Sequence, residues 1–381
     1  MEKISLYIHI PFCLKKCHYC DFYSIVASDD IIDSYIEGLI TEIALRANNS
    51  ERDKIQVSSI YLGGGTPSLL NARQINQILA AIRKDYHVIP EAEITIEINP
   101  ETMKQSIYRQ YLNEGINRFS IGIQSFNDDD LKALGRIHNS KTALKTVSDA
   151  HKAGCKNISL DLIFGIPNQS LLNWQKNIKI ALGQNIAHLS LYGLTIESGT
   201  PLETMIVQNL IGKADEEVER NMYLYNMDYL ESRGFHHYEI SNYALPGYLC
   251  RHNMSYWDGT SYIGLGASAH SLWGGERMWN ICNVAEYTKL LLQQTLAIEG
   301  KEVLTKEKIL LEYIMLGFRR TNGIALNDFK DKFDEDFLMK YRSQIEELMS
   351  YDSPLIAINN GRIRLTKEGL TLYNEVCAYF L

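Results

Sequence analysis

Three cysteines lie close together near the start of the chain, at Cys13, Cys17 and Cys20. Thiolates at this spacing can bind three irons of one 4Fe–4S cluster, whose closed form needs a fourth cysteine. The remaining iron then keeps an open coordination position, which is typical of a site that performs chemistry. Zinc is the alternative, and it would need a fourth ligand such as His9 or His18. The spacing favours the cluster over zinc.

The CxxxCxxC spacing resembles that of the radical S-adenosylmethionine (SAM) superfamily. In that superfamily SAM chelates the open iron, and an electron from the cluster cleaves SAM to a 5′-deoxyadenosyl radical. The resemblance implies that the cofactors carry the chemistry, while the protein binds, orients and shields them. Tyr19 matches the aromatic residue that usually lies between the second and third cysteines, and a simple packing role fits it equally well.

The composition of the 381 residues indicates one large domain, alone or with a small second one. The hydrophobic share of 45% is enough for a sizeable core. There is no apolar run of roughly 18 residues and no basic-then-apolar leader, so we expect a soluble, cytoplasmic protein. Four further cysteines are too scattered for a disulfide framework: Cys155, Cys250, Cys282 and Cys377.

The net charge of −8 argues against a nucleic-acid partner, because phosphate binding favours a basic surface.

Short β-branched runs alternate with helical patterns along the first half of the chain. The predicted strands are Ser5–His9, Ser59–Leu62, Glu93–Ile98, Arg118–Ile123, Asn157–Ile163 and His188–Leu194. The predicted helices include Ile31–Asn49, Asn71–Lys84, Lys141–Ala153, Trp174–Leu182 and Glu216–Arg233. This alternation predicts parallel strands in an α/β fold, as a partial (β/α)6 barrel. A flat doubly wound sheet is the alternative.

Polar motifs follow the ends of these strands. They are the cysteine loop, Gly63-Gly64-Gly65-Thr66-Pro67, Glu97-Ile98-Asn99-Pro100 and Gln124-Ser125-Phe126. In a barrel the C-terminal ends of the strands share one face, so these motifs are expected to converge on one site. The glycine triplet is expected to let the backbone approach a ligand closely.

The chain from 301 to 381 has a different pattern, and we expect it to form a separate domain after a core of residues 1–300. It contains the predicted helices Lys306–Arg319, Leu326–Phe333 and Phe337–Met349, then a hairpin turn at Asn360-Gly361. This order predicts a winged-helix-like module. A lid or packing role is favoured over DNA binding, because the would-be recognition helix carries Glu346 and Glu347.

Five motifs in this order resemble the oxygen-independent coproporphyrinogen III oxidases and their relatives, over nearly the whole chain. They are Tyr7-Ile8-His9-Ile10-Pro11-Phe12-Cys13, the GGGTP segment, Glu97-Ile98-Asn99-Pro100-Glu101, Gly122-Ile123-Gln124-Ser125-Phe126 and Asp161-Leu162-Ile163-Phe164-Gly165-Ile166-Pro167. The resemblance implies SAM contacts at Tyr7, Gly64, Gly65, Thr66, Glu97, Gln124, Arg136 and Asp161, with Tyr19 beside the cluster.

The chemistry of these side chains agrees with such contacts. Glu97 or Asp161 can accept from ribose hydroxyls or from the SAM ammonium, and Arg136 can hold the SAM carboxylate as a fork. Gln124 offers both a donor and an acceptor. Without the resemblance, each carboxylate could equally be satisfied by a neighbouring loop.

Two departures distinguish this chain from the oxidases. Phe22 stands where the oxidases have a further cysteine, and the chain begins six residues before Tyr7, whereas the oxidases carry an extension that helps to cover the substrate. Both features fit the HemW branch of the family, whose members are regarded as haem chaperones. The resemblance then implies three partners: haem, a haem-acceptor protein and an electron donor for the cluster.

The segment His252-Asn253-Met254-Ser255-Tyr256-Trp257 matches an HNxxYW motif typical of that branch. Imidazole is a standard axial ligand of haem iron, so His252 is the candidate haem ligand. Tyr256 and Trp257 could stack against a porphyrin. Arg251 could meet a propionate, and Cys250 is a second candidate ligand.

Three hypotheses follow. The first is a haem chaperone on a radical SAM scaffold. The second is an enzyme, a coproporphyrinogen dehydrogenase-like oxidoreductase that decarboxylates coproporphyrinogen III. The third is a radical SAM enzyme that modifies nucleic acid, which would need a basic extra domain that the sequence does not show.

Overall fold

The computed structural model describes residues 2–49 and 55–380. Its centre is a run of six parallel strands: β1 (Glu2–Ile10), β2 (Ile55–Gly64), β3 (Val88–Ile98), β4 (Arg118–Gln124), β5 (Ile158–Phe164) and β6 (His188–Gly193). Each strand pairs with its neighbour in sequence, from β1 to β6. A doubly wound sheet would instead reverse its strand order at a switch point. The predicted partial (β/α)6 barrel is confirmed.

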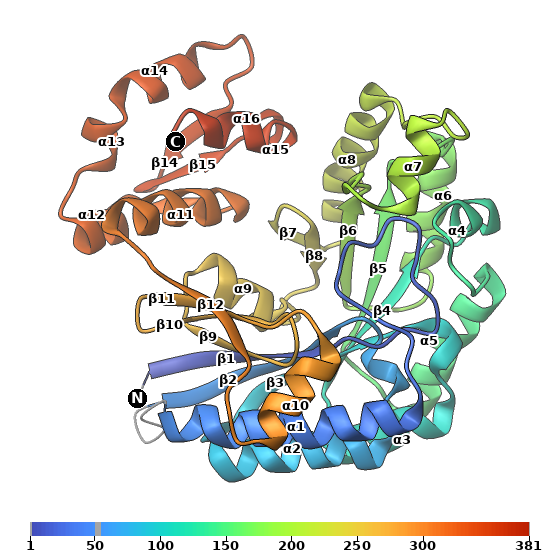
Figure 1. Ribbon diagram of the computed structural model, residues 1–381. Helices are drawn as coiled ribbons and strands as arrows, with labels where there is room; N and C mark the ends of the chain where they lie inside the picture. Colours follow the sequence, from blue (N-terminus) through green and yellow to red (C-terminus); the bar gives the residue numbers. More distant parts are fainter. Residues whose placement is uncertain (1, 50–54, 381) are drawn as a thin grey trace.

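Helices cover the outer face of these strands (Figure 1). They are α1 (Asp29–Asn49), α2 (Ala72–Asp85), α3 (Gln105–Asn113), α4 (Asp128–Ala133), α5 (Ser140–Ala153) and α6 (Leu171–Leu182). Side-chain caps fix where several of them begin. Asn71 and Gln74 form a capping box before α2, and Asn139 accepts from the amide of Thr142 in α5.

The strands alternate between an apolar face and a polar face. The alternating apolar residues of β1, β3 and β5 belong to the main buried cluster, as do the covering helices. The other face carries polar side chains in register across the sheet. Ser5 pairs with Ser59 and Ser59 with Glu93, while Glu97 pairs with Ser120 and Ser120 with Ser159. Because strand residues alternate in direction, this second face forms a polar barrel interior.

Short strands extend the sheet on both sides, and these were not predicted. Beyond β6 lie β8 (Asn242–Ala244) and β7 (His236–Glu239). Beyond β1 lie β9 (Tyr262–Leu265), β10 (His270–Trp273), β11 (Glu276–Asn280) and β12 (Ile298–Val303). The connecting helices are α7 (Pro201–Val207), α8 (Glu216–Glu231), α9 (Arg251–Trp257) and α10 (Val284–Leu292).

The C-terminal part forms a module with its own apolar cluster (Figure 1). Its helices are α11 (Lys306–Arg319), α12 (Leu326–Phe333), α13 (Phe337–Lys340), α14 (Arg342–Ser350), α15 (Lys367–Thr371) and α16 (Tyr373–Ala378). Its small sheet pairs β15 (Arg362–Leu365) with β14 (Ile356–Asn359) and β13 (Ile324–Ala325). The helices at α11 and α12 and the hairpin are confirmed. Asn360 and Gly361 have φ of 49° and 69°, as a type I′ turn requires.

Two details of the C-terminal prediction need correction. The single helix predicted over Phe337–Met349 is two helices, because Tyr341 leaves helical geometry with φ −110° and ψ 30°. The predicted boundary at 300/301 falls inside β12, whose residues pair with β11 up to Val303. The module therefore begins after that strand. No helix within 2–49 or 55–380 is long and apolar enough to cross a membrane.

Candidate functional site

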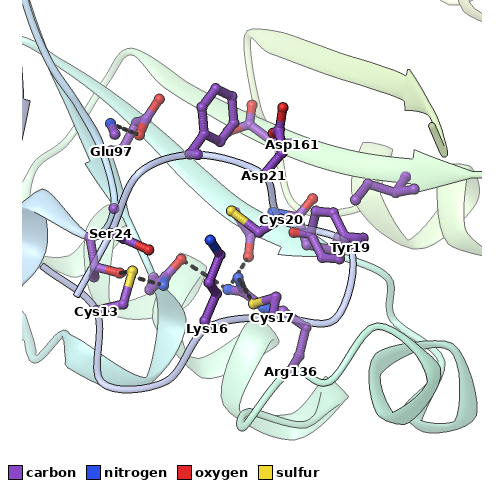
Figure 2. Close-up of a pocket in the computed structure, with 18 of the residues that line it drawn as sticks. Cys13, Lys16, Cys17, Tyr19, Cys20, Asp21, Ser24, Glu97, Arg136 and Asp161 are labelled. Atoms are coloured by element: carbon purple, nitrogen blue, oxygen red, sulfur yellow. Dashed lines mark hydrogen bonds between the residues drawn. The ribbon is translucent and has the colours of Figure 1, made fainter. Parts of the chain in front are cut away.

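A cavity of about 430 Å³ opens at the C-terminal ends of the barrel strands, beside the cysteine loop. Figure 2 shows the three thiols of the loop around this space, together with Tyr19, Glu97, Arg136 and Asp161. Eleven predicted residues line it: Cys13, Cys17, Tyr19, Cys20, Gly64, Gly65, Thr66, Glu97, Gln124, Arg136 and Asp161. The structure therefore brings the sequence-predicted motifs together at one face of the barrel.

The cysteine loop is anchored at two places. Phe12 and Ile25 form a bridge that closes the loop, and the amide of His18 donates to the carbonyl of Leu134 at 3.0 Å. All three cysteines are free thiols. The Thr66 hydroxyl donates to Cys13 Sγ at 3.4 Å, and an Arg136 nitrogen donates to Cys17 Sγ at 3.5 Å.

The donor set fits a 4Fe–4S cluster better than zinc. His9 already uses both ring nitrogens, with the Tyr7 hydroxyl and the Tyr23 carbonyl at 3.0 Å each. His18 Nδ1 bonds the Ala133 carbonyl at 3.1 Å. Within the described residues no three His, Cys, Asp or Glu side chains are gathered closely enough for one metal ion. Zinc would need such a gathering, with each sulfur about 2.3 Å from the ion, whereas a cluster takes its thiolates on separate irons.

The glycine triplet allows close packing of the backbone at the edge of the cavity, which Gly64 and Gly65 line. A Cβ on Gly65 would lie 2.7 Å from the Phe12 carbonyl oxygen, and one on Gly64 would lie 2.6 Å from the His9 ring. The Gly64 φ of 111° also excludes most side chains. These glycines let the end of β2 press against the start of the cysteine loop.

Glu97 is held by two donors at the cavity wall. The Tyr61 hydroxyl donates to Glu97 Oε1 at 2.9 Å, and the Gly64 amide donates to Oε2 at 3.1 Å. Burial raises the pKa of the Glu97 carboxyl to about 7, although the bond from Tyr61 opposes that rise. Glu97 can therefore change charge near neutral pH.

Asp161 lies on β5, two strands along the same sheet from Glu97, and also lines the cavity. The Ser120 hydroxyl lies 2.9 Å and the Ser159 hydroxyl 3.2 Å from its carboxylate oxygens, and both donate to it. Burial raises the pKa of Asp161, and the serine hydroxyls oppose the rise. Such a carboxylate retains acceptor capacity for ligand hydroxyls.

Arg136 donates to three groups beside the cavity. Its guanidinium contacts Cys17, Asn99 Oδ1 at 2.9 Å and the Gly122 carbonyl at 3.1 Å. Its Nε is buried without a hydrogen-bond partner. An unpaired buried donor beside the thiols matches an anionic ligand group such as a carboxylate.

Gln124 lines the same cavity with a left-handed backbone, at φ 63°. This conformation costs a non-glycine residue about 1 kcal/mol and is common at functional sites.

Tyr7 does not line the cavity. It lies beside Tyr61, with ring centroids 6.3 Å apart, and its hydroxyl is bonded to His9. Tyr61, its partner in the β1–β2 register, lines the cavity instead. A direct SAM contact at Tyr7 stays a prediction, for a residue that lies behind the cavity wall next to Tyr61.

The HNxxYW segment forms α9, and His252 is only 1% exposed. Its Nδ1 bonds the Ser59 hydroxyl at 2.9 Å and its Nε2 bonds the Tyr256 hydroxyl at 3.1 Å. With both nitrogens bonded and no exposed edge, His252 does not offer a ligand to haem iron in this conformation. An axial haem ligand at this position stays a prediction, and it would require one of these two hydrogen bonds to open.

The residues next to His252 in the sequence also pack against other parts of the protein. The Tyr256 ring packs edge-on against His252 and Tyr262, and the Arg319 guanidinium lies 4.3 Å from the Trp257 ring centre. Cys250 is fully buried against Glu93, and burial raises the pKa of its thiol to about 12. The two candidate ligands, Cys250 and His252, are therefore buried, whereas Tyr256 and Trp257 are partly exposed and Trp257 lines a second, smaller cavity.

The cavity residues that were not predicted as site residues include Tyr61, Asn99 and Ser120. Each contacts a predicted residue, namely Glu97, Arg136 and Asp161. The available signal was the two-residue period of the strands, since Asn99 follows Glu97 by two and Ser120 is paired with Glu97.

Residues 7–179 match the Radical SAM superfamily, and residues 304–372 match the HemN C-terminal domain. The three-cysteine loop above a partial barrel thus defines a radical SAM protein. The chain is 35% identical to the protein named heme chaperone HemW from Lactococcus lactis subsp. lactis (strain IL1403), covering 99% of this chain and 97% of that one. It is 33% identical to heme chaperone HemW of Bacillus subtilis (strain 168), covering 99% of each. The chain belongs to the HemW family.

The fold also resembles that of the coproporphyrinogen III oxidase HemN from Escherichia coli, with a TM-score of 0.84. The match covers 100% of this chain and 90% of the other at 22% sequence identity, so it shows a shared fold.

Proposed function

We propose that this protein is a haem chaperone, which binds haem and passes it to an acceptor protein. The observation that carries the proposal is its similarity to proteins named heme chaperone HemW over nearly the whole of both chains. Within this chain, the Radical SAM match over residues 7–179 is followed by the HemN C-terminal match over residues 304–372.

The cavity is proposed to hold a 4Fe–4S cluster and SAM. Cys13, Cys17 and Cys20 would bind three irons, and the open fourth iron would take the amino and carboxylate groups of SAM. When bound, these cofactors supply one-electron chemistry.

The side chains around the cluster would hold SAM. Arg136, with its free Nε, suits the SAM carboxylate, while Glu97 and Asp161 suit the ammonium and the ribose hydroxyls.

Phe22 supports the chaperone over the oxidase. It lines the mouth of the cavity and is 63% exposed, at the place where the oxidases are expected to have a further cysteine. A phenyl ring cannot coordinate iron. The site therefore lacks the further thiol that the resemblance leads us to expect in the oxidases.

Anaerobic assays of the reconstituted protein, run side by side, test the proposal. Haem is titrated and followed by its Soret band, and the loaded protein is then mixed with an apo form of a b-type cytochrome. We expect about one haem per chain and its transfer to the cytochrome, with little conversion of coproporphyrinogen III. Steady formation of protoporphyrinogen IX, or absence of haem binding, would overturn the proposal.

A further inference from the structure

His252 is connected to the SAM cavity through Tyr61. The His252 and Tyr61 rings are stacked, with centroids 5.0 Å apart and an interplanar angle of 27°. The Tyr61 hydroxyl reaches Glu97 at 2.9 Å, and both Tyr61 and Glu97 line the cavity. Two contacts thus lead from the HNxxYW helix to a carboxylate of the site.

The His252 ring is fixed in one orientation. Ser59 and Tyr256 hold its two nitrogens, as described above. Ser59 also bonds Ser5 at 2.8 Å, and Ser5 donates to Ser255 in α9 at 2.7 Å. This closed set of contacts ties α9 to β1 and β2 beneath Tyr61.

The start of α9 is fixed as well. Glu93 accepts from the backbone amides of Arg251 at 3.1 Å and His252 at 3.0 Å. A carboxylate at a helix N-terminus stabilises the free amides there. The ring of His252 is therefore held from its backbone and from both nitrogens.

We propose that His252 is a positioning residue for the SAM site, which holds the Tyr61 ring so that its hydroxyl donates to Glu97. The inference rests on the proposed binding of SAM in this cavity. It gives the HNxxYW histidine a role that its burial permits, whereas iron ligation would require one ring nitrogen to lose its hydrogen bond and to become accessible.

The bond from Tyr61 bears on the charge of Glu97. Burial raises the pKa of Glu97 to about 7 and the Tyr61 hydroxyl lowers it, so losing this donor raises the pKa further. The other titratable groups that act on this region are Tyr7 on β1, Arg118 on β4, Asp161 on β5 and Tyr192 on β6.

His252 itself stays neutral in this pH range, because burial lowers its pKa to about 3. If the pH profile of SAM affinity shifts near pH 7 in a His252 variant, the shift must therefore come from the titration of another group.

The test measures SAM affinity by calorimetry between pH 6 and 8.5, on holoprotein with its cluster reconstituted anaerobically. The variants are His252→Ala, Tyr61→Phe and Tyr256→Phe, the last leaving the fold of α9 least disturbed. His237→Ala is the matched control, because His237 is also stacked on a tyrosine, Tyr243 at 4.3 Å, away from the cavity.

We expect wild-type affinity to rise as the pH passes about 7, where Glu97 becomes charged. His252→Ala and Tyr61→Phe should weaken SAM binding roughly tenfold at pH 7, as loss of a hydrogen bond to a charged group does. Both should also move the midpoint of the pH profile upward. Tyr256→Phe should give a smaller change in the same direction, and His237→Ala should match the wild type.

Two outcomes separate this inference from the proposed function. His237→Ala is expected to match the wild type. If His252→Ala and Tyr256→Phe also keep the wild-type SAM affinity and the wild-type midpoint of the pH profile, the positioning role is overturned while SAM binding stands. The same holds if His252→Ala loses the haem Soret band and keeps normal SAM binding. If the wild type itself does not bind SAM, the proposed cofactor site falls, and this inference falls with it.

Discussion

Glu97 and Asp161 are two largely buried carboxylates that face one cavity and depend on hydroxyl donors rather than on ion pairs. Tyr61 supports Glu97, and Ser120 and Ser159 support Asp161. No ion pair within the described part of the chain includes either carboxylate. Because neutral donors compensate burial only in part, the charged forms are disfavoured until a cationic or hydroxyl-rich ligand enters.

Glu97→Gln is expected to stabilise the cofactor-free protein at high pH. Burial raises the folded-state pKa of Glu97 from 4.5 to about 7, so the folded state binds more protons than the unfolded state between these values. Stability therefore falls as the pH rises through this window, by about 3 kcal/mol when complete. The glutamine side chain cannot ionise, so the variant does not lose stability in this way as the pH rises.

Melting temperatures at pH 5 and pH 8 measure the effect. The variant should melt close to the wild type at pH 5 and clearly above it at pH 8. Glu91→Gln, at an exposed glutamate on the same strand, is the control and should match the wild type at both values. Equal melting of Glu97→Gln and wild type at pH 8 would show that Glu97 is not disfavoured as an anion.

At the scale of elements, the end of β2 and the start of the cysteine loop depend on each other. The Gly65 amide donates to the Ile10 carbonyl at 2.9 Å, and the position of a Cβ on Gly65 is filled by backbone atoms of Phe12. Backbone atoms cannot move aside as a flexible side chain can. The start of the loop that carries the thiols thus packs directly against Gly65.

Gly65→Ala is expected to displace the cysteine loop and destabilise the protein by about 1–3 kcal/mol, as overpacking does. Because the displaced loop carries the three thiols, the iron content after anaerobic reconstitution should also fall. Gly212→Ala is the matched control, because a Cβ there meets no atom within 4 Å and its φ is not positive. Full iron content and unchanged melting in Gly65→Ala would refute this account of the triplet.

Much of the element arrangement could be predicted from the sequence. Strands β1 to β6 and helices such as α1 and α5 carry long, regular patterns, and the Asn360-Gly361 hairpin has an unambiguous turn signal. Strands β7 to β12 have only three to six residues each, too few for a periodic pattern to stand out. Their pairing depends on tertiary contacts that local sequence does not encode.

The residues of the candidate site also divide into those that the sequence predicted and those that it did not. The cysteines and the carboxylates were found because their residue types and strand-end positions carry chemistry by themselves. Tyr61 was missed, and His252 was interpreted as a haem ligand, because their roles depend on which residues lie beside them. The contact between these two rings becomes visible only in three dimensions.

At the scale of the whole molecule, α9 lies between the barrel and the C-terminal module. Its His252 end contacts β2, while Trp257 lies against Arg319 at the end of α11 and Asp258 pairs with Arg320. The module also meets α8, where Arg220 pairs with Glu368 at 2.7 Å. We infer that the module is a packing domain seated on the barrel, as the sequence favoured over DNA binding.

The most direct test of the cofactor site is electron paramagnetic resonance of the reconstituted, dithionite-reduced protein with and without SAM. Cys17→Ala is measured beside Cys282→Ala, in which the lost thiol is an exposed one outside the loop. The account predicts about four irons per chain in the wild type and in Cys282→Ala, with a cluster signal that changes when SAM is added, and loss of the cluster in Cys17→Ala. A signal indifferent to SAM, or zinc in place of iron, would contradict it.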